Sequence, residues 1–266
     1  MQKILVFTDI HFLEAGDQIG HLDPRERFQR GLEHACAHHP DAERIIICGD
    51  LVHHGRPTQY DVLRNALKDC PLPVHLMIGN HDRRAAFCDA FPETPVTQTG
   101  YVQSVIDSDM YRLILLDTLD EDAEIEHCGI LCKDRLEWLK DALETAHGKP
   151  VIVFTHHPPM DVGFHSMDRI GLSNKAEVLS LLKRFPNVCQ VISGHVHRTI
   201  SGAADGIPIS LFKSTCHQSP FATPEMDEHA SVDEPGAYGI LMLTEAGVIV
   251  HSEDFDIPGR RMLSYA

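Results

Sequence analysis

The chain has 266 residues, of which 43% are hydrophobic and 23% charged, a composition typical of a globular protein of one or two domains. Its formal net charge of −16 argues against a protein that binds nucleic acid polymers or a membrane surface, because such binding needs a basic face. No apolar run approaches the roughly 20 residues of a membrane-spanning helix, and the N-terminal run is too short and too polar downstream for a signal peptide. We therefore expect a cytoplasmic protein without nucleic acid or membrane partners.

Short apolar runs of strand length alternate with amphipathic segments through the first two thirds of the chain. The pattern predicts strands over residues 3–8, 44–48, 74–78, 111–118, 150–155 and 188–193. It predicts helices over residues 24–39, 57–70, 133–146 and 174–185, the last opening with Asn174 and Glu177 at the spacing of a capping box. A β-α-β-α-β series implies parallel strands joined by right-handed crossovers.

The remaining segments are shorter and more polar. From about residue 197 only short alternating runs appear, and they predict antiparallel strands and hairpins. Residues 120–130 are acidic, which predicts a surface excursion of the chain. Arg83 and Arg84 are predicted to be the solvated start of a helix. No linker or internal repeat divides the chain. We expect one α/β domain over residues 1–266, a two-sheet α-β-β-α sandwich whose β-rich C-terminal portion offers edges for oligomerisation.

The cysteines and histidines differ in what their positions indicate. The 8 cysteines lack the spacing of a zinc knuckle and read as free thiols in a chain that is neither short nor evidently secreted. The 19 histidines are more than packing calls for. Many of them lie in five polar clusters that each follow a predicted strand, namely Asp9–His11, Gly49–Val52, Gly79–Asp82, Thr155–Pro159 and Gly194–Arg198.

These clusters predict a single site. Because ligands bind outside the carboxyl ends of the strands in open α/β sheets, clusters at several strand ends should meet on one rim. Their carboxylates, imidazoles and amide suit Fe, Mn, Zn or Co. Each cluster alone has an ordinary explanation, since Gly-Asp and Gly-Asn are turn dipeptides and a strand-end histidine often lies at the surface. Five in order, each directly after a strand, favour a metal site.

The ordered set D-x-H, GD-x-V, GNHD, THHPP and GHVH resembles the calcineurin-like metallophosphoesterases, from residue 4 to about residue 217. Within it, "GDLVHHGRPTQY", the loop after "THHPP" and "KSTCHQSPF" resemble the class III cyclic nucleotide phosphodiesterases and the glycerophosphodiesterases. The resemblance implies a binuclear centre of two divalent or trivalent transition metals. The implied ligands are Asp9, His11, Asp50 and His197 for the first metal, and Asp50, Asn80, His156 and His195 for the second.

The resemblance also implies a mechanism, in which a hydroxide that bridges the metals attacks a small phosphodiester such as a 3',5'-cyclic nucleotide or a glycerophosphodiester. Asp50 would bridge the metals, and His81 would protonate the departing oxygen. Asp82 reads as a residue that fixes a backbone turn or orients an imidazole, and His157 as a residue that shapes the backbone.

Substrate contacts are less marked in the sequence. The implied substrate-binding residues are Asn80, His81, His197, His217 and Arg56, while His53, His54 and Phe221 also follow strand ends near the expected mouth. For the residues at the mouth an ordinary surface role fits as well, and Arg56 fits a turn beside Pro57 equally.

Three functions remain open at this stage. The first is a phosphodiesterase, favoured because few basic residues lie near the motifs. The second is a phosphomonoesterase of the same fold, and the third is a metal-free interaction scaffold, against which the seven filled ligand positions argue. A serine or cysteine hydrolase fits poorly, since no G-x-S-x-G motif occurs. By analogy with the subgroup, we expect a homo-oligomer.

Overall fold

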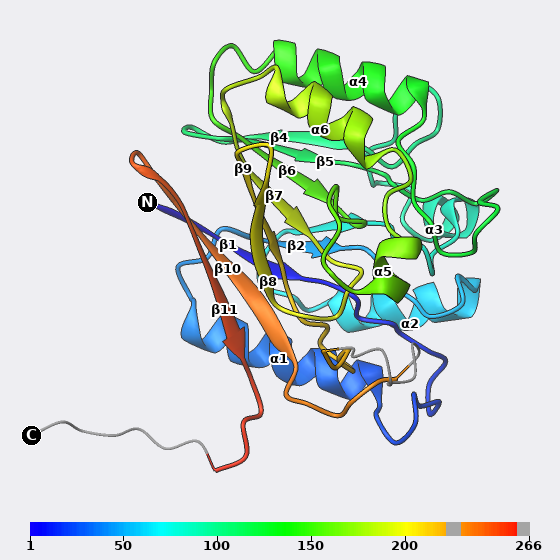
Figure 1. Ribbon diagram of the computed structural model, residues 1–266. Helices are drawn as coiled ribbons and strands as arrows, with labels where there is room; N and C mark the ends of the chain where they lie inside the picture. Colours follow the sequence, from blue (N-terminus) through cyan, green and yellow to red (C-terminus); the bar gives the residue numbers. More distant parts are fainter. Residues whose placement is uncertain (222–229, 260–266) are drawn as a thin grey trace, which may run out of the picture.

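Two β-sheets form the centre of the structure, a computed structural model that describes residues 1–221 and 230–259 (Figure 1). The first sheet has the order β11-β10-β1-β2-β3 and the second β4-β5-β6-β7-β9-β8. The first sheet comprises β1 (Gln2–Phe7), β2 (Arg44–Cys48), β3 (Val74–Met77), β10 (Ala237–Thr244) and β11 (Gly247–Asp254). The second comprises β4 (Ser104–Asp107), β5 (Arg112–Leu115), β6 (Val151–Thr155), β7 (Val188–Ser193), β8 (Ile200–Ala204) and β9 (Ile207–Leu211).

Helices lie on the outer faces of both sheets (Figure 1). The first sheet is flanked by α1 (Pro24–His38), α2 (Pro57–Leu67) and α3 (Arg84–Ala90). The second is flanked by α4 (Lys133–Glu144) and α6 (Lys175–Lys183), and the short α5 (His165–Arg169) follows β6. The predicted two-sheet α-β-β-α sandwich is confirmed.

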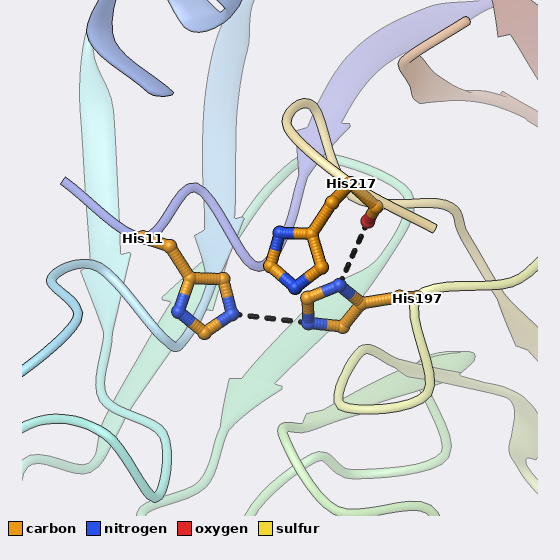
Figure 2. A group of neighbouring side chains, drawn as sticks. All are labelled: His11, His197 and His217. Carbon is orange, nitrogen blue, oxygen red and sulfur yellow. Dashed lines mark hydrogen bonds between the residues drawn. The ribbon is translucent and has the colours of Figure 1, made fainter. Parts of the chain in front are cut away.

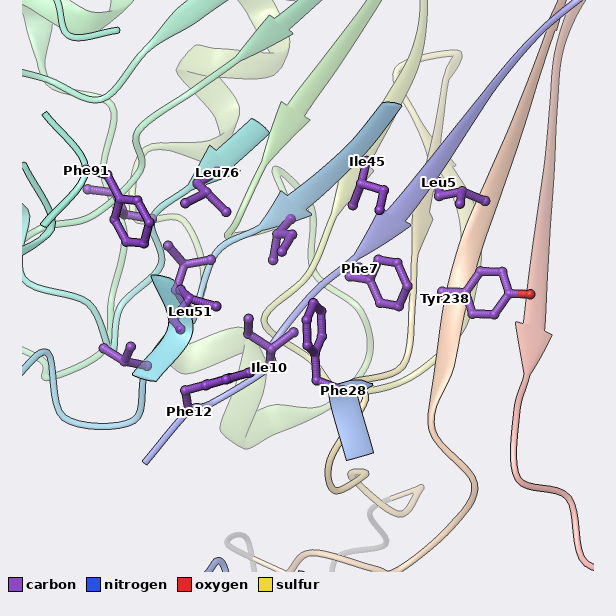
Figure 3. Packing of buried hydrophobic residues seen from close by; sticks show 14 of the residues in the cluster. Leu5, Phe7, Ile10, Phe12, Phe28, Ile45, Leu51, Leu76, Phe91 and Tyr238 are labelled. Carbon is purple, nitrogen blue, oxygen red and sulfur yellow. The ribbon is translucent and has the colours of Figure 1, made fainter. Parts of the chain in front are cut away.

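Three hydrophobic clusters hold these layers together. One lies between the first sheet and its helices, where Phe7 of β1 meets Phe28 of α1 at a ring-centroid distance of 5.4 Å (Figure 3). A second lies between the other sheet and its helices, and the third joins the two sheets through residues such as Ile46 and Ile152. Burial on both faces explains why the central strands are continuous apolar runs.

The parallel core was predicted better than its additions. β4 and α5 were not predicted, and the C-terminal strands are not all antiparallel, because β9 runs parallel to β7. Asn174 does not cap α6 through its side chain, which instead donates to the Leu131 carbonyl at 2.8 Å and accepts from the Leu131 amide at 3.1 Å. The predicted capping box is therefore wrong, because this amide bridges to another segment.

Two expectations concern the outside of the molecule. β11 is an edge strand of the first sheet and could pair with another chain. Oligomerisation through the C-terminal portion stays a prediction. Among the described residues, no helix combines the length and the apolar character that crossing a bilayer would require. The end of the C-terminal tail, residues 260–266, lies outside the described part of the chain.

Candidate metal centre

The seven predicted metal-binding residues meet where the strands of both sheets end. Each is buried, with at most 7% of its surface exposed. They follow β1 (Asp9, His11), β2 (Asp50), β3 (Asn80), β6 (His156) and β7 (His195, His197). The fold therefore brings the strand-end clusters together on one rim, as their positions in the sequence predicted.

One donor group gathers around His11 and His197. Their Nε2 atoms lie 3.0 Å apart. Asp9 Oδ1 lies 3.4 Å from His197 Nε2, and Asp50 Oδ2 lies 3.6 Å from His11 Nε2. The four residues each offer a ligand atom, and these atoms all lie within 4.8 Å of one another, a spacing that one metal ion can span.

A second donor group gathers around the side-chain oxygen of Asn80. This Oδ1 atom lies 3.0 Å from His156 Nε2 and 2.8 Å from His195 Nδ1. Asp50 joins this group as well, because its Oδ1 lies 3.3 Å from His156 Nε2. Asp50 thus presents one carboxylate oxygen to each group.

Backbone carbonyls fix the tautomers of two of these histidines. His156 Nδ1 donates to the Cys48 carbonyl at 2.8 Å, and His197 Nδ1 donates to the His217 carbonyl at 2.9 Å (Figure 2). In the neutral form that binds a metal, the Nε2 lone pair of each ring is then directed into its donor group. In the second group His156 Nε2 faces the acceptor oxygen of Asn80. Asp50 raises the pKa of His156 to about 9 against the effect of burial, so in the metal-free protein a protonated ring donates to this oxygen, and a shared cation can take the place of that proton. The donor set therefore fits transition-metal ions.

Charge is distributed unevenly over the centre. Burial acts to raise the pKa of Asp50, but the neighbouring His156 and His81 outweigh it and hold this pKa well below its usual value. Burial and the charge of His156 lower the pKa of His195 to about 3. An ionised carboxylate and a neutral imidazole are the forms that bind metals.

The backbone adopts an uncommon conformation at these positions. Five of the residues have positive φ, a region that non-glycine residues seldom occupy: Asp9 (52°), His11 (47°), Asp50 (48°), His195 (71°) and His197 (53°). Such strain concentrates at functional sites. The backbone is also closely packed here, since a Cβ on Gly79 would lie 2.3 Å from Asp50 Oδ1. The glycine of the Gly-Asn dipeptide thus leaves room for Asp50.

The centre opens into a cleft of about 360 Å³. Imidazoles cover much of its wall, and two apolar side chains come from α5 and the residue that follows it. The lining residues are His11, Asp50, His53, Asn80, His81, His127, Met167, Ile170, His195, His197, His217, Ser219, Ala230 and Ser231.

His81, the predicted acid, lies in this wall with a fixed orientation. Its backbone N–H donates to Asp50 Oδ1 at 2.9 Å, and its Nδ1 donates to the His53 carbonyl at 2.8 Å. Nε2 is therefore the ring atom that remains for a ligand in the cleft. The ring is stacked between His53 and His127, with centroid distances of 5.1 Å and 4.8 Å.

The other predicted contacts divide between the cleft and its surroundings. His217 lines the cleft, and its ring centroid lies 4.4 Å from that of His197. His53 also lines it, whereas His54 is exposed. Arg56 is not among the lining residues, and its guanidinium lies 3.5 Å from a Glu14 carboxylate oxygen. Phe221 is 63% exposed and also lies outside the lining.

Sequence reasoning missed six residues that line the cleft: His127, Met167, Ile170, Ser219, Ala230 and Ser231. Of these, His127 is the one that contacts a predicted metal-binding residue through a ring nitrogen. It lies in the segment predicted to be a surface excursion, and its Nδ1 is 3.0 Å from the Asn80 Nδ2. A lone histidine in an acidic loop carries no strand-end signal. The two ring nitrogens of His157 contact Thr118 Oγ1 and the His127 carbonyl, so this side chain supports the backbone at His127.

Comparison with known proteins agrees with this geometry. The family model for calcineurin-like phosphoesterases matches residues 2–199. The chain belongs to this family. The match confirms the resemblance to calcineurin-like phosphoesterases seen in the sequence.

Two curated relatives and one solved structure place this calcineurin-like phosphoesterase further. It is 36% identical to a Rhodopseudomonas palustris protein named "Probable cyclic nucleotide phosphodiesterase", over 97% of this chain and 94% of the relative. It is 32% identical to a glycerophosphodiester phosphodiesterase of Enterobacter lignolyticus, over 74% of this chain and 70% of the relative. A dimetal phosphatase from Danio rerio shares the fold, with a TM-score of 0.73, 15% identity and coverage of 95% and 96%.

Proposed function

We propose that this chain is a phosphodiesterase that hydrolyses small phosphodiesters, such as 3',5'-cyclic nucleotides or glycerophosphodiesters, with two transition-metal ions held in the cleft. The observation that carries the proposal is the position of Asp50, whose two carboxylate oxygens face two separate donor groups. Asp9, His11 and His197 would complete one ligand set, and Asn80, His156 and His195 the other. Such metals supply Lewis acidity and lower the pKa of water toward neutrality.

The residues of the chain position the substrate and assist the departure of the leaving group. The Nδ1–H group of His81 donates to the His53 carbonyl, which leaves Nε2 directed at the cleft. When Nε2 carries a proton, it can donate that proton to the departing ester oxygen. His217 lines the same cleft and can donate a hydrogen bond to a phosphoryl oxygen. Arg56 points to Glu14 in this conformation and would have to leave it to reach a substrate.

The size and charge of the cleft favour a small, singly charged diester. A volume of about 360 Å³ suits a small molecule. No lysine or arginine occurs among the described residues that line it, so the chain offers no side chain of fixed positive charge to a dianionic monoester. The names of the two curated relatives refer to cyclic nucleotides and glycerophosphodiesters, which supports the same class.

A substrate comparison tests this proposal. Metal-loaded protein is assayed with an aryl phosphodiester and the matching aryl phosphomonoester, followed by cyclic nucleotides and glycerophosphodiesters. We expect a higher kcat/KM for the diesters. A strong preference for the monoester would favour the phosphomonoesterase, and less than one transition metal per chain at neutral pH would favour the metal-free scaffold.

A further inference from the structure

The acidic segment between β5 and α4 sends one side chain into the cleft. Residues 121, 122, 124, 125 and 126 are exposed, as expected for a surface excursion. The segment nevertheless returns to the body of the protein at Gly129, which is buried and forms isolated bridges with Leu119 and Leu172. His127 lies just before this return and lines the cleft.

His157 holds the backbone of His127 in place. Its Nε2 donates to the His127 carbonyl at 3.0 Å, while its Nδ1 accepts from Thr118 Oγ1 at 2.8 Å. The path of the chain is tight, because a Cβ on Gly129 would lie 2.3 Å from His157 Nδ1. His127 itself has a φ of 72°, in the left-handed region. A buried histidine thus holds His127 in a conformation that the chain seldom adopts.

The ring of His127 contacts the amide of Asn80. Its Nδ1 lies 3.0 Å from Asn80 Nδ2, while Asn80 Oδ1 faces His156 and His195 on the other side. An amide turned by 180° would direct its NH₂ group at the two imidazoles and withdraw its oxygen. An imidazole nitrogen that accepts from Nδ2 favours the orientation with the oxygen toward the donor group.

We propose that His127 is a positioning residue for the second metal site: by accepting a hydrogen bond from Asn80 Nδ2, it holds Asn80 Oδ1 toward His156 and His195. This inference rests on the proposed function, because it assigns Asn80 to a metal. His127 lies outside the five strand-end clusters, so the proposal gives the acidic segment a part in the site. Thr118, His157 and His127 then form a chain of contacts that supports Asn80.

Two substitutions separate the effect of the hydrogen-bond acceptor of His127 from the effect of its aromatic ring. His127→Asn places an oxygen where the histidine has Nδ1, and asparagine tolerates positive φ, so it retains the acceptor while losing the ring beside His81. His127→Ala loses both. The matched control is His147→Ala, because His147 also has positive φ (50°) and is exposed at the surface.

The experiment measures metal affinity rather than activity. Chelator-treated protein is titrated with Co²⁺, followed by calorimetry and visible absorption. We expect two binding events in the unmodified protein. His127→Ala should weaken one of them by about 10–100-fold, the usual effect of losing a partner that orients a metal ligand, whereas His127→Asn should stay within about threefold. His147→Ala should match the unmodified protein.

The outcomes distinguish this inference from the proposed function. Unchanged affinity in His127→Ala, or equal loss in His127→Asn and His127→Ala, would overturn the positioning role and leave the binuclear site standing. Fewer than two binding events in the unmodified protein would overturn both.

Discussion

Asn80 and His81 are neighbours in the chain but face different partners. Asn80 directs its oxygen at His156 and His195, and a neutral amide adds no charge to a centre that already holds two carboxylates. His81 contacts Asp50 only through its backbone N–H, and its ring is held by the carbonyl of His53. Under the proposed function, one residue would bind a metal and the next would transfer a proton.

Two alanine substitutions test this division. His81→Ala should leave the metal content near normal and lower kcat by about 10²–10⁴-fold, the usual contribution of a general acid. The loss should be smaller for substrates with good leaving groups, which need less protonation. Asn80→Ala should instead lower the affinity of the second metal site. Kinetics and metal analysis of both variants check this, and loss of that metal in His81→Ala would contradict it.

At the scale of elements, Asp82 joins the turns that follow β2 and β3. Its carboxylate accepts from the backbone N–H groups of Leu51 at 3.1 Å and Gly79 at 2.8 Å, and from the Tyr60 hydroxyl at 2.9 Å. Burial and the charge of Asp50 raise the pKa of this buried carboxyl to about 7. The turns that place Asp50 and Asn80 thus share one acceptor, which confirms that Asp82 fixes the backbone.

Removal of that acceptor should be costly. Asp82→Ala would leave buried N–H groups without partners, and each such group costs about 1–3 kcal/mol. We expect a lower free energy of unfolding in chelator-treated protein, measured by urea denaturation, together with weaker metal binding. Asp69→Ala, at an exposed position after α2, should stay within about 0.5 kcal/mol of the unmodified protein. Equal stability of the two variants would show that the turns do not depend on Asp82.

Periodicity predicted the elements that are buried and regular, and it failed where contacts are distant in sequence. β4 has four residues and no fully buried one, and α5 has five with none buried, so neither carries an apolar pattern. Arg84, predicted to be solvated, instead pairs with buried Asp117 at 2.8 Å across 33 residues. His127 reaches Asn80 across 47 residues in the same way. The strand-end motifs could be predicted to share one site because a strand directly precedes each of them.

At the scale of the whole molecule, a net charge of −16 opposes the approach of an anionic substrate. Metal ions in the cleft would reverse this locally. In their absence, the same cleft makes the fold sensitive to pH, because it packs many imidazoles together. Burial lowers the pKa of His195 and of His217 to about 3, from an ordinary value of 6.5.

The sign of the pH effect follows from proton linkage. Below pH 6.5 the unfolded chain protonates these two histidines, whereas the native state does not until about pH 3, so the free energy of unfolding falls as the pH drops through this window. Each group contributes roughly 1 kcal/mol per pH unit. His156 acts in the opposite window, because its pKa, raised to about 9 chiefly by Asp50 against the effect of burial, adds stability that is lost between pH 6.5 and 9.

The metal-free protein should therefore be most stable near pH 6.5, and urea denaturation across the pH range checks this. His217→Asn should flatten the acid limb, since it removes a buried titrating ring whose Nδ1 has no partner within the described residues. His147→Asn, at an exposed position, should leave the limb unchanged. Stability that stays constant from pH 6.5 to 4.5 would contradict the argument, because it would mean that the native cleft takes up protons as readily as the unfolded chain.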